Sequence, residues 1–191
     1  MERKAWDQLV STAGLVIAIV LLAMGALAIY GGNFGRNNVR DRLTPEKVFF
    51  APYDSMSPQE QATLGDFAGQ QVTNGTQAEA FARYIAGHLK EINGGKTYAE
   101  TSAAARAEGV PADEAAALAA KADILFKGET LRSIMLNAYG WWTVATIAFW
   151  AGWVMIAAGI VLLVLAIFGF RHAKRAAASV AVPAEPAAVT A

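Results

Sequence analysis

The chain contains two histidines, His88 and His172, which are the first residues to consider for acid–base or metal chemistry. A histidine ring can exchange a proton near neutral pH or bind a metal through a nitrogen. His88 falls on the apolar face of a predicted helix, four residues after Tyr84, where we expect a hydrogen-bonded core histidine. His172 belongs to a basic cluster that follows a long apolar segment. We therefore predict no catalytic histidine and no metal site.

Two further motifs can be compared with known chemical signatures. The segment GGKT at 94–97 is similar to the end of a phosphate-binding loop, but it follows a predicted helix and lacks the first glycine of that motif. We interpret it as the end of one helix and the start of the next. Asp113 and Glu114 are adjacent, so they point in different directions on a helix and make a poor general acid–base pair.

The composition excludes several classes of function. Sixteen basic and sixteen acidic side chains give a net charge of zero, so we expect no attraction for nucleic acid. The chain has no cysteine, which excludes disulfides, zinc–thiolate sites, iron–sulfur clusters and cysteine nucleophiles. We predict no cofactor.

Two apolar segments predict membrane-spanning helices. Neither Leu9 to Tyr30 nor Trp141 to Phe170 contains a charged residue. A helix covers the ~30 Å hydrocarbon core of a bilayer in about 20 residues, so both segments are long enough to cross. Their ends carry the aromatic and basic residues typical of membrane interfaces. These predicted interface anchors are Trp6, Tyr30, Tyr139, Trp141, Trp142, Arg171, Lys174 and Arg175.

The first segment could instead be a cleavable signal peptide, because Arg3 and Lys4 form a basic start and Ala26-Leu27-Ala28 fits a cleavage site. We favour an uncleaved span, since the apolar run exceeds the roughly 7–15 residues of a signal-peptide core. Basic residues near the spans are balanced between the two sides, but loops longer than ~60 residues cross largely regardless of charge. We therefore predict that the tails, 1–8 and 171–191, are cytoplasmic and that residues 31–140 lie outside.

Small residues recur at every seventh position in both apolar segments. They are Ser11, Ala18, Gly25 and Gly32 in the first, and Ala145, Gly152, Gly159 and Ala166 in the second. This period keeps one stripe facing a partner helix, and small side chains allow close approach in lipid. The pattern predicts that the two spans pack as an antiparallel hairpin, with self-association through the same faces as the alternative.

Residues 31–140 have the signals of a small helical domain, which makes the predicted fold all-α. Capping boxes, in which a hydroxyl and a carboxylate satisfy open amides, predict helix starts at Ser57 to Glu60, Thr76 to Glu79 and Thr97 to Glu100. Glycines predict helix ends at 74–75, 93–95 and 109, and glycines at 31, 32 and 35 are expected to loosen the chain after the first span. The segment KVFFAPY at 47–53 predicts a short strand or an extended arm.

The end of this domain leads into the second span. Pro111 predicts the start of a fourth helix, which Gly128 is expected to end. A helical face from Leu131 to Ala138 continues into Trp141, so we predict one helix from Glu129 to Phe170, about 63 Å long. The Ala/Val/Pro-rich tail after Arg175 predicts disorder.

Two blocks, GGKTYAE at 94–100 and GETLRSIMLNAY at 128–139, resemble a group of uncharacterised two-span membrane proteins of actinobacteria. Some similar sequences carry the label of an aromatic-ring-opening dioxygenase. A non-haem iron site of the facial type needs two histidines and a carboxylate together, whereas the predicted topology places His88 and His172 on opposite sides of the membrane. The resemblance implies a membrane location and topology and supplies no catalytic residue.

We expect a non-enzymatic integral protein of the bacterial cytoplasmic membrane, an accessory or scaffold subunit whose outer helical domain docks a partner. The expected partners are the lipid bilayer and another membrane protein or complex, with a homo-oligomer as a further option. One alternative is a sensor or regulator that relays a signal through the last helix. Another is an enzyme, which would require a polar cleft containing His88, Glu91 or Lys96.

Overall fold

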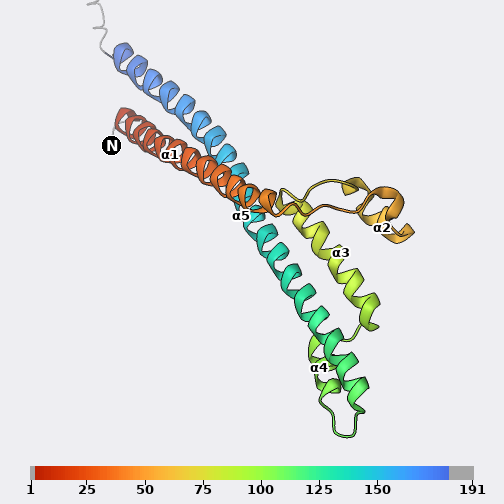
Figure 1. Ribbon diagram of the computed structural model, residues 1–191. Coiled ribbons are helices and arrows are strands. Elements are labelled where there is room, and N and C mark those ends of the chain that lie inside the picture. Colours follow the sequence, from red (N-terminus) through yellow and green to blue (C-terminus); the bar gives the residue numbers. More distant parts are fainter. Residues whose placement is uncertain (1–2, 181–191) are drawn as a thin grey trace, which may run out of the picture. The chain divides into compact units, whose positions relative to one another are not determined.

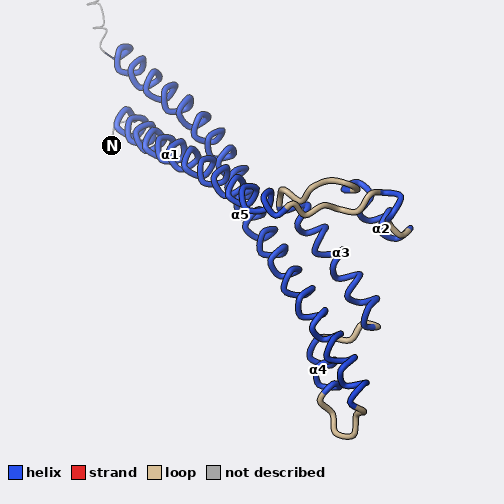
Figure 2. The backbone as a smooth tube through the Cα atoms, viewed as in Figure 1, coloured by secondary structure: helices blue, strands red, loops and turns tan. Residues whose placement is uncertain are grey.

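The computed structural model describes residues 3–180, which form helices joined by turns and loops (Figures 1 and 2). The helices in chain order are α1 (Arg3–Leu43), η1 (Thr44–Glu46), η2 (Tyr53–Ser55), α2 (Pro58–Leu64), η3 (Gly65–Phe67), α3 (Gly75–Asn93), α4 (Tyr98–Ala105) and α5 (Ala112–Val180). Within the described range the β geometry is limited to one isolated bridge, between Phe49 and Gln71. The all-α prediction is confirmed.

The chain divides into two compact units. The first, the apolar unit, combines Met1–Gly31 with Ile147–Ala191, and the second, the intervening domain, is Gly32–Thr146. Two helices, α1 and α5, are long and apolar enough to cross a membrane. Of the predicted cytoplasmic C-tail, residues 171–180 continue α5, and the remainder lies outside the described residues.

Both long helices continue past glycines where the sequence predicted a loosened or ended helix. Helix α1 runs through glycines 31, 32 and 35 to Leu43, and Pro45 follows in a 3₁₀ turn. Helix α5 joins the predicted fourth helix to the predicted span, so the expected end at Gly128 is wrong. The reason is packing, because a Cβ at position 128 would lie 2.5 Å from Leu89 Cδ2 of α3. Gly128 provides space for a neighbour instead of ending a helix.

The intervening domain has its own apolar core, centred on α3. Two pairs of rings meet on Phe50, which stacks on Phe67 at 5.3 Å and contacts Phe81 edge-on at 5.3 Å. The buried members of this core come from α1, α2, α3, α5 and the loops between helices; they are Val39, Leu43, Phe50, Met56, Leu64, Val72, Ala78, Ala80, Phe81, Ala82, Ile85, Leu89, Leu125 and Met135. Because α1 and α5 both contribute, the core fastens the start of α3 to the two long helices.

The predicted strand or arm at 47–53 is an extended arm paired with the segment before α3. Phe50 N donates to Gln70 O at 2.9 Å, and Val72 N donates to Val48 O at 2.9 Å. Successive side chains alternate, so Phe50 is 3% exposed and Phe49 is 55% exposed. The arm therefore supplies one aromatic ring to the core and presents the other at the surface.

Two of the three predicted capping boxes are confirmed. Ser57 with Glu60 begins α2, and Thr97 with Glu100 begins α4, each with both reciprocal hydrogen bonds. The box predicted at Thr76 is wrong, since α3 begins earlier, at Gly75, and is capped by Asn74, whose side chain accepts from Gln77 N.

The first predicted helix is shorter than expected. It ends at Leu64, a 3₁₀ turn follows, and the chain then extends toward Asn74. The predicted end at residues 74–75 is thus the start of α3. A positive φ of 68° at Gly69 marks the point where the chain leaves the 3₁₀ turn.

Two glycines allow a matched test of core packing. Gly87→Ala is expected to stabilise the domain by about 0.5–1 kcal/mol, because Gly87 is exposed, has open space around it and lies inside α3. Gly128→Ala is expected to destabilise it by about 1 kcal/mol or more, because the added methyl overlaps the buried Leu89 side chain. Thermal unfolding in mild detergent, followed by circular dichroism, measures both. Equal shifts for the two variants would contradict the packing assigned to Gly128.

Candidate functional sites

The first candidate site is the line of small residues along α1 and α5, which we call the seam. All eight residues of the predicted stripes are buried. Ser11, Ala18, Gly25, Gly152, Gly159 and Ala166 belong to the apolar unit, whereas Gly32 and Ala145 belong to the intervening domain.

In the apolar unit the seam brings backbone close to backbone. A Cβ on Gly152 would lie 2.7 Å from Gly25 O and 2.8 Å from Ile29 N. A Cβ on Gly159 would lie 3.2 Å from Ala18 O, and one on Gly14 would lie 3.9 Å from Ala166 Cβ. In these contacts the residue number falls along α5 as it rises along α1. Only small side chains permit this approach.

The outer faces of the same helices are apolar and large. In the most apolar 18-residue stretch of each helix, only 11% of the residues are buried. The exposed side chains include Leu9, Val16, Ile17, Ile19, Leu27, Ile147, Trp150, Val154, Val161, Leu165 and Phe168. The helix pair therefore has small residues at its contact and large apolar residues on its surface. A water-soluble helix pair has the reverse arrangement, with large apolar residues at the contact and polar residues on the surface.

The predicted interface anchors have two kinds of environment. Trp6, Tyr30, Tyr139 and Trp141 are exposed, as are Arg171, Lys174 and Arg175. Trp142 is half-buried in the intervening domain, where it packs against Gly75 at the start of α3 and the Arg36 guanidinium lies 5.1 Å from its ring centroid. Trp142 therefore connects α1, α3 and α5 within that domain.

The second candidate site is a polar cluster of Glu60, Tyr84 and His88 on the surface of the intervening domain. His88 is exposed, so the expectation of a core histidine is wrong. Its ring lies 4.4 Å from the Tyr84 ring, and its Nδ1 lies 3.6 Å from Glu60 Oε1. Its neighbour from α2 is therefore a carboxylate and not an apolar side chain.

Hydrogen bonding and burial shift the pKa values of Glu60 and Tyr84. The Ser57 amide and hydroxyl both donate to the Glu60 carboxylate, and with the nearby His88 they lower the pKa of Glu60 despite its partial burial. Burial, and then the charge of Glu60, raise the pKa of the Tyr84 phenol. These interactions serve to begin α2 and hold it on α3.

The lowered pKa of Glu60 gives a prediction of pH dependence. Because the folded pKa lies below the ordinary value of 4.5, the ionised carboxylate stabilises the fold above about pH 4.5, and this contribution is lost as pH falls through the folded pKa. Glu60→Gln, which keeps an acceptor but does not titrate, should be less stable than the native chain at pH 7, and the gap should narrow as the pH falls below 4.5. Unfolding across this pH range measures the difference, and a gap of constant size would show that the Glu60 charge is not its source.

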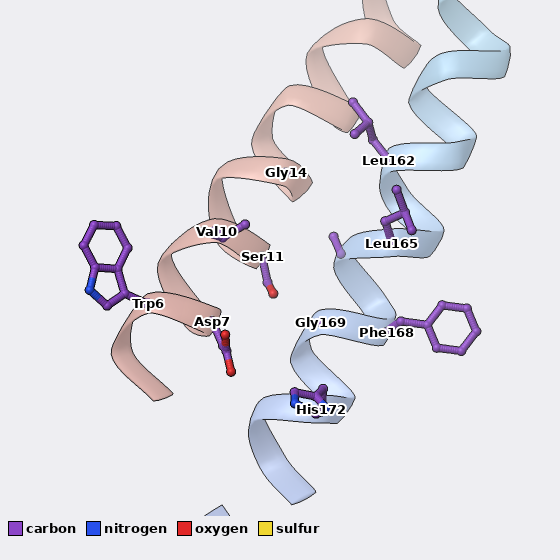
Figure 3. Close-up of a pocket in the computed structure, with 11 residues that line it drawn as sticks. Trp6, Asp7, Val10, Ser11, Gly14, Leu162, Leu165, Phe168, Gly169 and His172 are labelled. Carbon is purple, nitrogen blue, oxygen red and sulfur yellow. The ribbon is translucent and has the colours of Figure 1, made fainter. Parts of the chain in front are cut away.

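The third candidate site is a groove of about 560 Å³ at one end of the apolar unit, between the first turns of α1 and the last turns of the apolar part of α5. Val10, Leu162 and Leu165 line its apolar part, and the small residues Gly14, Ala166 and Gly169 are also part of the lining. Asp7 and Ser11 project from α1 toward the α5 turn that carries Gly169 and His172 (Figure 3). None of His88, Glu91 and Lys96, which the enzyme hypothesis placed in a cleft, lines this groove.

Among residues 3–180, no three His, Cys, Asp or Glu side chains gather closely enough to hold a metal ion. No protein-family model, curated protein or solved structure matches the chain.

Proposed function

We propose that the chain is an integral membrane protein in which α1 and α5 cross the bacterial cytoplasmic membrane as an antiparallel pair. Both termini lie in the cytoplasm, and the intervening domain lies outside. The observation that carries this proposal is the reversed packing of the apolar unit, with a seam of Gly, Ala and Ser inside and large apolar side chains outside. In water such a surface would aggregate, whereas lipid tails solvate it.

The function that this arrangement supports best is that of a non-enzymatic accessory or scaffold subunit. The intervening domain exposes apolar side chains beside α4, on both sides of the buried Leu125 of α5. There the rings of Tyr98 and Phe126 lie 5.8 Å apart and are exposed, as is Ile124. Exposed aromatic residues of this kind are typical anchors of protein–protein interfaces. A partner protein that covers them is the proposed occupant.

A second candidate function, sensor or regulator, is favoured by the continuity of α5. This helix has 69 residues and belongs to both units of the chain. A binding event on the intervening domain that shifts or rotates α5 would reach its other end without an intervening loop.

Topology is the first test, and the absence of cysteine makes it direct. The chain should remain in the membrane after alkaline carbonate extraction. A single cysteine introduced by Ala107→Cys should react with a membrane-impermeant maleimide in intact spheroplasts, and one introduced by Lys174→Cys should react only after lysis. Extraction into the soluble fraction, or the opposite labelling pattern, would overturn the proposed topology. The mass of the mature chain shows whether the first span is retained.

Partner docking is tested with matched charge insertions on α5. Ile124→Asp and Phe126→Asp should reduce co-purification of a partner at least tenfold, whereas Ala120→Asp, at an exposed alanine of the same helix, should leave it unchanged. Equal co-purification with all three variants would reject this surface as the docking site.

A further inference from the structure

The groove at the end of the apolar unit is not explained by the packing of α1 against α5 along the seam. It opens beside the small residues of the seam and has a volume of about 560 Å³. That volume is in the range of sites for small organic ligands. The inference below rests on the proposed function, because it takes the groove to lie at the boundary between lipid and cytoplasm.

The walls of the groove are amphipathic along its length. Val10, Leu162 and Leu165 belong to the uncharged spans, whereas Asp7 and His172 lie just beyond the two span ends. Trp6 and Phe168, also part of the lining, lie on the outer sides of the two helices (Figure 3). An occupant must therefore have a hydrocarbon part that continues into the bilayer and a polar part at the interface.

The polar side chains at this end of the groove come from both helices. Asp7 of α1 supplies a carboxylate, which accepts hydrogen bonds from a cation. His172 of α5 supplies ring nitrogens, and the exposed Arg171 and Lys174 are its neighbours in sequence. Basic side chains at this level attract a phosphate. A headgroup that carries both an ammonium and a phosphate complements this pair of helix ends.

We propose that the groove binds a phospholipid with a primary amine in its headgroup, of the phosphatidylethanolamine class. One acyl chain lies along Val10, Leu162 and Leu165, the phosphate lies toward His172 and its basic neighbours, and the ammonium donates to the Asp7 carboxylate. A trimethylammonium headgroup has no N–H to donate, and a glycerol headgroup has no positive charge. The Asp7 carboxylate thus discriminates among lipids that share the same acyl chains and phosphate.

The test is competition between lipids of matched acyl chains. The full chain, purified in mild detergent, is incubated with equimolar phosphatidylethanolamine, phosphatidylcholine and phosphatidylglycerol, and retained lipids are counted by native mass spectrometry. We expect about fivefold more ethanolamine lipid than choline lipid, because both headgroups are cationic but only the primary ammonium donates a hydrogen bond, and a hydrogen bond of ~1 kcal/mol supplies this factor. Equal retention, a preference for phosphatidylglycerol, or a lipid-free dimer that occupies the groove with a second copy would overturn the proposal.

Two variants and a control locate the site. Asp7→Asn should bring the ethanolamine-to-choline ratio near one, whereas Asp41→Asn, the same change at an exposed position of α1 outside the apolar unit, should preserve it. Val10→Asp, at an exposed position of the lining, should reduce retention of all three lipids by placing a charge against the acyl chain. An unchanged ratio in Asp7→Asn would overturn the proposal. A chain released by alkaline carbonate refutes the membrane proposal itself, while a retained chain without lipid preference refutes only the groove assignment.

Discussion

Replacing Gly152 with leucine is expected to force α1 and α5 apart and to lower the free energy of unfolding by about 3 kcal/mol, the upper range for overpacking a fitted site. A side chain at position 152 meets Gly25 O and Ile29 N at less than 3 Å. Both are backbone atoms of a helix, so neither can rotate away. For a chain of this length, a loss of this size lowers the melting temperature by about 10 °C.

The control for this substitution is Gly31→Leu. Gly31 belongs to the same unit and lies in α1, but it has no atom within 4 Å of its Cβ direction. Leucine is a better helix former than glycine by about 0.8 kcal/mol, so this variant should match or exceed the native stability. Intrinsic fluorescence during heating in mild detergent reports both variants, because Trp150 and Trp153 lie close to Gly152 in sequence. A Gly152→Leu protein that melts with the native chain would show that the helices do not meet at this glycine.

The sequence was most informative where one local interaction decides the structure. At Ser57 and Thr97 the hydroxyl and the carboxylate three residues later satisfy each other's backbone amides, and no distant contact competes. At Thr76 the same pattern failed because Asn74 caps the helix two residues earlier. Glu79, which the box required, instead forms an ion pair with Arg83 at 2.9 Å.

Glycine was the residue that sequence reasoning interpreted least well. It predicts a helix end through its conformational freedom, yet in a helix it also permits close approach. Gly94 follows the first meaning, with a φ of 59° after α3, and Gly128 follows the second, against Leu89. These two roles of glycine cannot be distinguished without knowing which residue packs against the glycine, and that is a property of the tertiary structure.

The candidate sites also differ in how well the sequence predicted them. The heptad spacing of small residues was sufficient to select the seam residues that the structure buries, because the period alone places them on one face. The groove was missed, although Asp7 and His172 stand at the ends of the two spans that the sequence predicted to pack. Its signal was the combination of that pairing with the small residues Gly14 and Gly169, which are also part of its lining.

The pairing of α1 with α5 can be fixed by a single covalent bond. The distance between a Cβ on Gly14 and Ala166 Cβ is 3.9 Å, which is within the range of about 3.5–4.5 Å found in disulfides. The double variant Gly14→Cys with Ala166→Cys should therefore oxidise almost completely, with no background thiol since the chain has no cysteine. In the chain-entropy model, closing so long a loop stabilises the fold by about 5 kcal/mol.

The control pair is Gly14→Cys with Ile167→Cys. Residue 167 is the next position on α5, turned by about 100° around the helix, and its side chain is exposed, so this pair should remain reduced under the same oxidant. Non-reducing electrophoresis separates the outcomes. A fast-migrating monomer from the 14–166 pair requires that both thiols belong to one chain, as in the proposed antiparallel pair. A disulfide-linked dimer from the same pair would assign these faces to self-association, because the small residues that admit α5 of the same chain would then admit a helix of another.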